Sequence, residues 1–516
     1  MQQSIVLIIR DGWGVNPNPE FNAVMNAHTP KTDDLLKKYP NILLSASGCS
    51  VGLPDGYQGS SEVGHLNMGA GRVVVQEMTR IMQSIQDGSF FQSQNFQKAV
   101  SNVLDNNSAL HLMGLVQDEG VHAHQDHLFA IMKYAKERGV KRVYIHFFTD
   151  GRDTSPRSAL HYIGVLKQKI EEYKIGEIAT IMGRYYAMDR GRNWELTTIA
   201  YDALTRAQGV KITDIDDAIR DVYNTKTPNG EAMFDEYIPP MIVGDFKGIR
   251  DGDSVIHINY RQDRAIQLTK AFVEEDYPGV RWKKLDIVYC GLTRYYDTFR
   301  YNILGAMNDS GGMHNLLGQV LSQKGLRQVR IAETQKFSHV TSFFNGKRTE
   351  PYTGEEQIEI KGEYDPATFA SHPEMNARDV TRKTIEIINS NSFSLLVINL
   401  ANCDMVGHTG DYEAAKKAVE VVDECVGLLV DEVLSHNKIA LITADHGNAE
   451  EMIDYETRIP KTSHTKNLVE FIYVAEDYKN VKLVESGILS DIAPTILYLL
   501  GIEKPAEMTS KNLIIV

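Results

Sequence analysis

Aspartate and histidine residues follow three short apolar runs of this sequence, at the places where buried strands would end. The runs are IVLII, LLVINL and IALIT, and one further histidine stands later, in the segment TSHT. Carboxylate and imidazole groups without cysteine suit Mn²⁺, Zn²⁺ or Mg²⁺. Two such clusters would hold two ions about 4 Å apart, an arrangement that clamps a phosphoryl group. Each residue alone could be a helix cap or an ordinary loop residue, but the set favours a metal centre. The candidate ligands are Asp11, Asp404, His408, Asp445, His446 and His464.

Two adjacent serines, Ser60 and Ser61, lie in the glycine-rich segment GSSEVGHLNMGAGR at 59–72. A hydroxyl at the start of a helix, beside a divalent ion, can attack phosphorus. The N–H groups of the same helix end can bind the phosphate. The pattern Ser-Ser-Glu is equally typical of a helix cap, so the residues alone leave both roles open.

Arginines gather at three further strand exits, in a chain that is acidic overall. The planar guanidinium group binds carboxylate and phosphate through two hydrogen bonds. His122, in GVHAH, and Asp153, in DGRDT, stand in similar loops. Any one arginine could form an ordinary surface salt bridge, but together they predict a focused anion site. The arginines are Arg152, Arg184, Arg190, Arg261 and Arg264.

The elements that must position these residues alternate along the chain. The apolar runs are continuous, as expected of strands that are buried on both faces. Helical patterns lie between them, for example at 156–173, where a proline falls near the first turn, and at 411–434. This alternation predicts an α/β fold with mostly parallel sheets. The predicted strands are 5–9, 109–115, 142–148, 178–182, 255–260, 286–292, 395–400 and 439–443.

The spacing of the candidate residues predicts two domains. The metal-ligand candidates come from 11–61 and 404–464, whereas the arginines and His122 come from 122–264. Ligands of one metal cluster must meet within a few ångströms, so the two ends of the chain must fold together. We therefore predict one domain from 1–75 plus 312–516, and a second α/β domain, 76–311, inserted into it. The candidate hinges are 70–78 and 305–313, and we expect the site in the cleft between the domains.

Composition narrows the class of protein. The chain has 516 residues, of which 42% are hydrophobic and 24% charged, and this excludes wholesale disorder. Its net charge of −14 argues against a nucleic-acid binder or an anionic-membrane binder. Four scattered cysteines, a short N-terminal apolar run and no apolar stretch of about 20 residues predict a cytoplasmic protein. We expect a small-molecule substrate, no nucleic-acid or membrane partner, and a monomer.

Motifs along nearly the whole chain resemble, in order, those of the cofactor-independent phosphoglycerate mutases. The resemblance implies an alkaline-phosphatase-like metal domain carrying the insert. It also implies an isomerase of glycolysis and gluconeogenesis, which interconverts 3-phosphoglycerate and 2-phosphoglycerate through a phosphoserine, without 2,3-bisphosphoglycerate. The motifs are DGWG, SEVGHLNMGAGR, LMGLVQDEGVHAH, TDGRDTSP, GRYYAMDR, NYRQDRA, AETQKFSHVTSFFNG, ANCDMVGHTG and ADHGNAEEM.

The resemblance also implies roles for individual residues. Ser61 would be the phosphorylated nucleophile, although Ser60 stands where asparagine is usual in the family. Asp153 would carry the proton of the glycerate hydroxyls, with His122 as the alternative. Two Mn²⁺ ions are implied, with Zn²⁺, Mg²⁺ or Co²⁺ as substitutes. One ion would be held by Asp404, His408 and His464, and the other by Asp11, Ser61, Asp445 and His446. The implied substrate-binding residues are His122, Arg152, Asp153, Arg184, Arg190, Arg261, Arg264 and Lys336, the last near the phosphate.

Two other interpretations remain. The chain could be a metal-dependent phosphatase, or a different phosphomutase, on the same core. It could also be a non-catalytic anion-binding protein that descends from an enzyme. The matched insert residues argue against the first interpretation, and the intact ligand set argues against the second.

Overall fold

The computed structural model describes residues 3–515 except 229, 231, 297, 300, 305–312 and 391. The chain divides into two compact units, Met1–Gln76 with Asp309–Val516, and Glu77–Asn308. The first predicted joint, between 75 and 76, lies one residue before the change of unit after Gln76. The second predicted joint, between 311 and 312, lies outside the described residues. Residues 305–312 of the second predicted hinge also lie outside them. Within the described residues, every helix is too short or too polar to cross a membrane.

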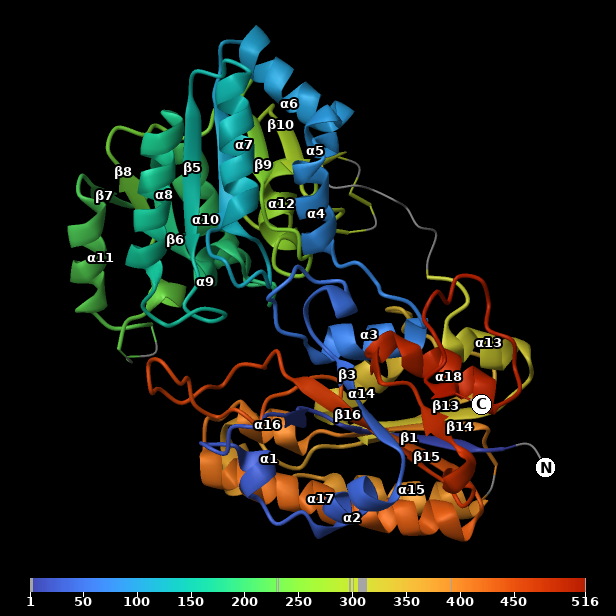
Figure 1. Cartoon of the computed structure of the whole chain (residues 1–516). Coiled ribbons are helices and arrows are strands. Elements are labelled where there is room, and N and C mark those ends of the chain that lie inside the picture. The colour runs from blue at the N-terminus through green and yellow to red at the C-terminus, as the bar shows by residue number, and fades with distance from the viewer. Residues whose placement is uncertain are drawn as a thin grey trace. The chain divides into compact units, whose positions relative to one another are not determined.

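The first unit is built on one large sheet (Figure 1). Its strands run in the order β13-β12-β14-β1-β15-β16-β3-β18, and β2 pairs with β16. From β13 to β15 all pairs are parallel, whereas β16 is antiparallel to both β15 and β3. The strands are β1 (Ile5–Arg10), β2 (Gly14–Val15), β3 (Asn41–Ser45), β12 (Gln328–Glu333), β13 (Glu355–Ile360), β14 (Leu395–Leu400), β15 (Ile439–Thr443), β16 (Leu468–Val474) and β18 (Ser486–Ile488), with a separate pair β17 (Lys482–Leu483) and β19 (Ile514–Ile515).

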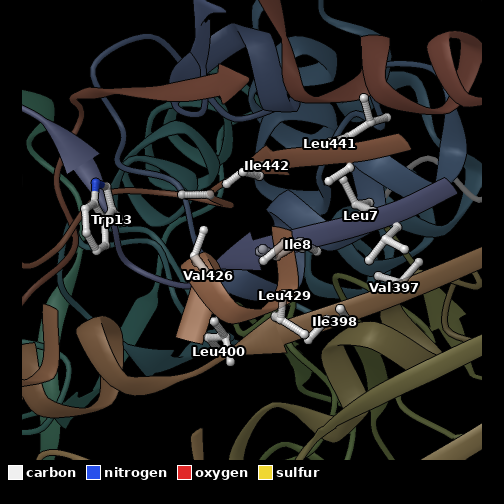
Figure 2. Close-up of a cluster of buried hydrophobic side chains, with 14 of the residues drawn as sticks. Leu7, Ile8, Trp13, Val397, Ile398, Leu400, Val426, Leu429, Leu441 and Ile442 are labelled. Atoms are coloured by element: carbon white, nitrogen blue, oxygen red, sulfur yellow. The ribbon is translucent and has the colours of Figure 1, made fainter. Parts of the chain in front are cut away.

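Helices cover both faces of this sheet, with α2, α15 and α17 on one face and α3, α13 and α18 on the other (Figure 1). The helices are α1 (Ala23–Asn26), α2 (Pro30–Lys38), α3 (Ser61–Ala70), α13 (Leu317–Gln323), α14 (Thr334–Ser338), α15 (Ala377–Ser390), α16 (Asn402–Gly407), α17 (Tyr412–Ser435) and α18 (Ile492–Leu499). Because both faces are covered, every residue of the central strand β1 is buried. Figure 2 shows side chains of β1, β14, β15 and α17 packed together, among them Ile8, Ile398 and Leu429. Burial of each such side chain stabilises the fold by about 1.5–3 kcal/mol.

The second unit has its own sheet, in the order β11-β10-β9-β4-β5-β6-β8-β7. Every pair is parallel except β6 with β8. Its strands are β4 (Leu110–Leu115), β5 (Val143–Thr149), β6 (Glu177–Gly183), β7 (Val210–Ile212), β8 (Met241–Val243), β9 (Ser254–His257), β10 (Val288–Gly291) and β11 (Asn302–Ile303). Its helices are α4 (Glu77–Gln86), α5 (Ser89–Gln92), α6 (Gln94–Asp105), α7 (Gln125–Glu137), α8 (Ala159–Tyr173), α9 (Arg184–Ala187), α10 (Trp194–Arg206), α11 (Ile215–Tyr223) and α12 (Ile266–Val273). The predicted α/β class with mostly parallel sheets is confirmed.

Two predicted elements differ from the structure by three residues at one end, more than the other predicted elements do. The helix predicted at 156–173 begins only at Ala159, because a distant carboxylate organises its start: Asp235 Oδ2 accepts the N–H groups of Ser158 and Ala159. The strand predicted at 255–260 ends at His257. The next residues contact the loop of His122 instead of a neighbouring strand: the carbonyl oxygen of His122 accepts the Tyr260 N–H at 2.9 Å. Both differences arise from tertiary contacts that local sequence does not contain.

Candidate functional site

The candidate metal ligands of the first unit lie at the carboxyl ends of three neighbouring strands. Asp11 directly follows β1, Asp404 lies in α16 after β14, and Asp445 follows β15. Because β14, β1 and β15 are adjacent and parallel, their exits meet at one edge of the sheet. Residues that are more than 430 positions apart in the sequence therefore become neighbours: the Gly12 N–H donates to Asp445 Oδ1 at 3.4 Å.

Two groups of side chains there could each hold a metal ion, with ligand atoms within 4.8 Å of one another. One group is Asp404, His446 and His464, and the other is Asp11, Asp445 and His446. His408 Nε2 lies 3.1 Å from Asp404 Oδ1, beside the first group. The structure thus brings the six predicted aspartate and histidine ligands together. It places His446 in both groups, whereas the family resemblance assigns His446 to the Asp11 group alone.

Ser61 is the first residue of α3, and its hydroxyl lies among these ligands. Ser61 Oγ is 2.8 Å from His446 Nε2 and donates to Asp11 Oδ1 at 3.2 Å. Ser60 has the other role that its sequence pattern allows: its Oγ accepts the N–H of Val63 at 3.4 Å and caps α3. The geometry therefore favours Ser61 over Ser60 as the nucleophile.

Lys336, in α14 after β12, extends its ammonium group into the same cluster. Its Nζ donates to Ser61 Oγ at 2.6 Å, to Asp11 Oδ1 at 2.7 Å and to Asp404 Oδ2 at 2.6 Å. Burial by itself would lower the pKa of Lys336, but the carboxylates of Asp11 and Asp404 raise it overall. Lys336 therefore stays charged, next to the hydroxyl of Ser61.

The cluster carries more negative than positive charge. Burial, with the neighbouring charge of Asp445, raises the pKa of Asp11 to about 7. The pKa of Asp404 is well below its usual range: burial opposes this shift, but Lys336 and His408 outweigh it. Three buried carboxylates thus share one ammonium group, Lys336. Carboxylate oxygens, imidazole nitrogens and excess negative charge fit a divalent cation.

Three polar residues that sequence reasoning missed hold these ligands. Asn399 Nδ2 donates to Asp11 Oδ2 at 2.7 Å, Asn448 Nδ2 donates to Asp404 Oδ1 at 3.0 Å, and His65 Nδ1 lies 3.3 Å from Asp445 Oδ2. Asn399 left a signal in the sequence, since it is the single polar residue of the run LLVINL. The other two contacts depend on tertiary structure.

The second unit gathers the predicted anion-binding residues around the buried Arg184. Its Nη1 donates at 2.6 Å to both Asp150 Oδ1 and Asp153 Oδ2. His122 Nε2 lies 3.8 Å from Asp153 Oδ2. Burial, followed by the charge of Arg184, lowers the pKa of His122 to about 3. This imidazole is therefore neutral at physiological pH and a weak base.

The other arginines of this unit present partly exposed guanidinium groups. Arg190 and Arg261 both pair with Asp263, at 2.7 and 3.3 Å, and Arg152 lies 3.4 Å from Glu236. Arg264 Nη1 donates to the carbonyl oxygen of Met188 at 3.1 Å. Burial, and then the charges of Arg184, Arg190 and Arg152, lower the pKa of Arg264. All five predicted arginines thus form one cluster, together with acidic side chains. Sequence reasoning missed their acidic partners Asp150, Glu236 and Asp263.

Comparison with known proteins shows the family of the chain. A model of the metalloenzyme superfamily matches residues 3–504. A 2,3-bisphosphoglycerate-independent phosphoglycerate mutase of Acetivibrio thermocellus is 46% identical, over 99% of this chain and 99% of its own length. The protein of the same name from Clostridioides difficile is 46% identical, over 100% of this chain and 99% of its own length. The chain belongs to this family of mutases.

A solved structure supports the family assignment. A crystal structure of Leishmania mexicana phosphoglycerate mutase at low cobalt concentration matches with a TM-score of 0.77 and 30% identity, over 100% of this chain and 98% of that chain. Phosphoglycerate mutases are isomerases, so the predicted family and enzyme class are confirmed. The superfamily and the two ligand groups together support binding of a divalent metal.

Proposed function

We propose that this mutase interconverts 3-phosphoglycerate and 2-phosphoglycerate through a phosphoserine at Ser61, without 2,3-bisphosphoglycerate. One observation carries the proposal: the hydroxyl of Ser61 contacts Asp11, His446 and Lys336 at the point where both ligand groups meet. We further propose two Mn²⁺ ions per chain, and action as a cytoplasmic monomer in glycolysis and gluconeogenesis, with no nucleic-acid or membrane partner.

The residues of the first unit would capture the phosphoryl group. The proposed ligands of one ion are Asp404, His408 and His464, and those of the other are Asp11, Ser61, Asp445 and His446. When bound, the ions would lower the pKa of the Ser61 hydroxyl and neutralise the charge of the phosphate. Lys336 orients Ser61 Oγ through its 2.6 Å contact and offers positive charge to the phosphate oxygens.

The residues of the second unit would hold glycerate while the phosphoryl group is on Ser61. Arg152, Arg190 and Arg261 have exposed donors for the carboxylate, whereas buried Arg184 orients Asp153. Asp153 is the proposed carrier of the hydroxyl protons. His122 is the second candidate, because its lowered pKa keeps the imidazole neutral and able to accept a proton.

Metal removal tests this function directly. Purified protein with Mn²⁺ should interconvert the two phosphoglycerates without added 2,3-bisphosphoglycerate, and exhaustive chelation should abolish turnover.

Activity should also fall as the pH drops below neutrality, because protons compete with the metal for histidine ligands. His408 should take up a proton first, since Asp404 outweighs burial and raises its pKa. Added Mn²⁺ should partly restore the activity lost in acid. Full activity after chelation would contradict the proposal.

Weakening the arginine cluster should divert the phosphoryl group to water. Arg261→Ala removes charge-assisted hydrogen bonds worth about 1.5–3 kcal/mol each, a loss of about tenfold to a hundredfold in turnover. Glycerate should then escape before it reorients, which leaves the phosphoserine to hydrolysis. We expect the ratio of inorganic phosphate to 2-phosphoglycerate formed from 3-phosphoglycerate to rise.

A matched control is Arg220→Ala, which removes an exposed arginine of α11 that pairs with Asp217 in the same unit. This variant should keep the ratio of the parent. If Arg261→Ala lowers both products equally, the second unit positions the phosphoryl group itself, and the proposed division of roles is wrong.

A further inference from the structure

Glu450 is a fully buried carboxylate in the first unit that the proposed chemistry does not use. It lies in the loop after β15, five residues beyond Asp445, and is 0% exposed. No ion pair to Glu450 is found among the described residues. A buried charge without a counterion is costly unless hydrogen bonds compensate it. Its environment therefore indicates a function beyond packing.

Four donors from three segments converge on this carboxylate. Glu450 Oε2 accepts the backbone N–H groups of Gly14 at 3.1 Å and Asn448 at 2.8 Å. Glu450 Oε1 accepts the Thr465 hydroxyl and, at 2.9 Å, Asn467 Nδ2. Each carboxylate oxygen thus accepts two hydrogen bonds.

Each of these segments also carries candidate metal ligands. Gly14 follows Asp11 by three residues, Asn448 follows His446 by two, and Thr465 is next to His464. Glu450 therefore ties together the segments 11–14, 445–448 and 464–467. Through Asn448, whose side chain donates to Asp404 Oδ1 at 3.0 Å, the same network reaches the carboxylate of the fourth ligand segment.

Two glycines make room for Glu450. A Cβ atom on Gly14 would lie 2.4 Å from Glu450 Cδ, and a Cβ atom on Gly447 would lie 2.2 Å from Glu450 Oε1. Neither glycine has a positive φ angle, so the backbone conformation alone does not require glycine there. The glycines of DGWG and ADHGN at these two positions are therefore explained by the space that the carboxylate occupies.

We propose that Glu450 is a positioning residue that sets the metal affinity of the site. By fixing three loops to one carboxylate, it holds Asp11, His446 and His464 at the separations that a metal requires. Groups that orient metal ligands in this way commonly change metal affinity by 10–100-fold when they are replaced. The inference rests on the metal binding in the proposed function.

The variant Glu450→Gln tests the proposal. The amide keeps the shape of the side chain but has one oxygen and an NH₂ group, so two of the four donors lose their acceptor. We expect the Mn²⁺ dissociation constant of the chelator-stripped full chain, measured by calorimetry, to rise about 10–100-fold. The electron paramagnetic resonance spectrum of bound Mn²⁺ should change as well. Saturating Mn²⁺ should restore most of kcat, and KM for 3-phosphoglycerate should stay near that of the parent.

The control variant is Asp423→Asn. Asp423 is also buried, 2% exposed, and accepts the backbone N–H groups of Lys31 at 3.0 Å and Thr32 at 2.7 Å, neither of which is in a ligand segment. It should lose stability and keep the Mn²⁺ affinity of the parent. Thr465→Val removes only one of the four donors, so it should also weaken Mn²⁺ binding, but by a smaller factor than Glu450→Gln. This variant replaces Glu450→Gln as the test if Glu450→Gln does not fold.

The outcomes separate the two proposals. Unchanged Mn²⁺ affinity in folded Glu450→Gln, or in Thr465→Val if Glu450→Gln does not fold, overturns the role of Glu450, as does an equal loss of affinity in Asp423→Asn. A parent protein that binds no Mn²⁺ would instead overturn the metal site of the proposed function.

Discussion

Replacing Ser61 with alanine should lower mutase turnover by about four orders of magnitude or more, as the loss of a covalent nucleophile does in other enzymes. The substitution deletes the hydroxyl that contacts Asp11, His446 and Lys336. It should leave the fold intact, because alanine is the best helix former and Ser60 supplies the cap of α3. Turnover assays and thermal unfolding of the same preparation measure both effects.

Ser60→Ala is the matched control, one residue away. It removes the hydroxyl that accepts the N–H of Val63, which should cost about 1 kcal/mol of stability. Most of the turnover should remain, because Ser60 Oγ lies on the helix turn rather than among the ligands. Acid quenching followed by mass spectrometry of the peptides locates the trapped phosphate. Phosphate on Ser60 would show that the wrong serine has been chosen.

The sequence predicted the central strands well and the sheet edges poorly. The predicted strands 395–400 and 439–443 coincide with β14 and β15, since central parallel strands are buried on both faces and are therefore mostly apolar. By contrast, β13 (EEQIEI) has no fully buried residue, and such a strand leaves no apolar run. The antiparallel β16 (LVEFIYV) was also missed, because Glu470 interrupts its apolar run and its first residue is exposed.

The residues of the candidate site were predictable where they lie at or near the ends of predicted strands. Asp11, Asp404 and Asp445 follow apolar runs directly or closely, and the order of adjacent parallel strands brings them together. The residues that orient them were not predictable in this way. Glu450, for example, lies in a loop, and three of its four donors lie 15 and 17 residues away in one direction and 436 in the other.

Lys336→Met should lower turnover about a hundredfold to a thousandfold, the range for loss of one preorganised stabilising donor. Methionine keeps the length of the side chain but removes the ammonium group that contacts Ser61, Asp11 and Asp404. Metal-free protein should also lose about 3–5 kcal/mol of stability, because buried carboxylates are left without their cation. Turnover in saturating Mn²⁺ and denaturant unfolding of the chelated protein measure the two losses.

The pH dependence of that loss follows from the carboxylates. In the parent, Lys336 contributes to the low pKa of Asp404. This low pKa stabilises the fold at pH values above the ordinary carboxyl pKa, and the stabilisation is lost as the pH falls through the pKa of folded Asp404. Lys336 also limits the rise in the pKa of Asp11, so its removal moves both pKa values upward. The stability difference between parent and Lys336→Met should therefore be larger at pH 8 than at pH 5. Lys136→Met, which removes an exposed ammonium group that donates to the carbonyl oxygen of Lys174 at 3.1 Å, should show no pH-dependent loss of stability and keep its turnover. An equal loss at both pH values in Lys336→Met would mean that the carboxylates are neutralised by protons rather than by Lys336.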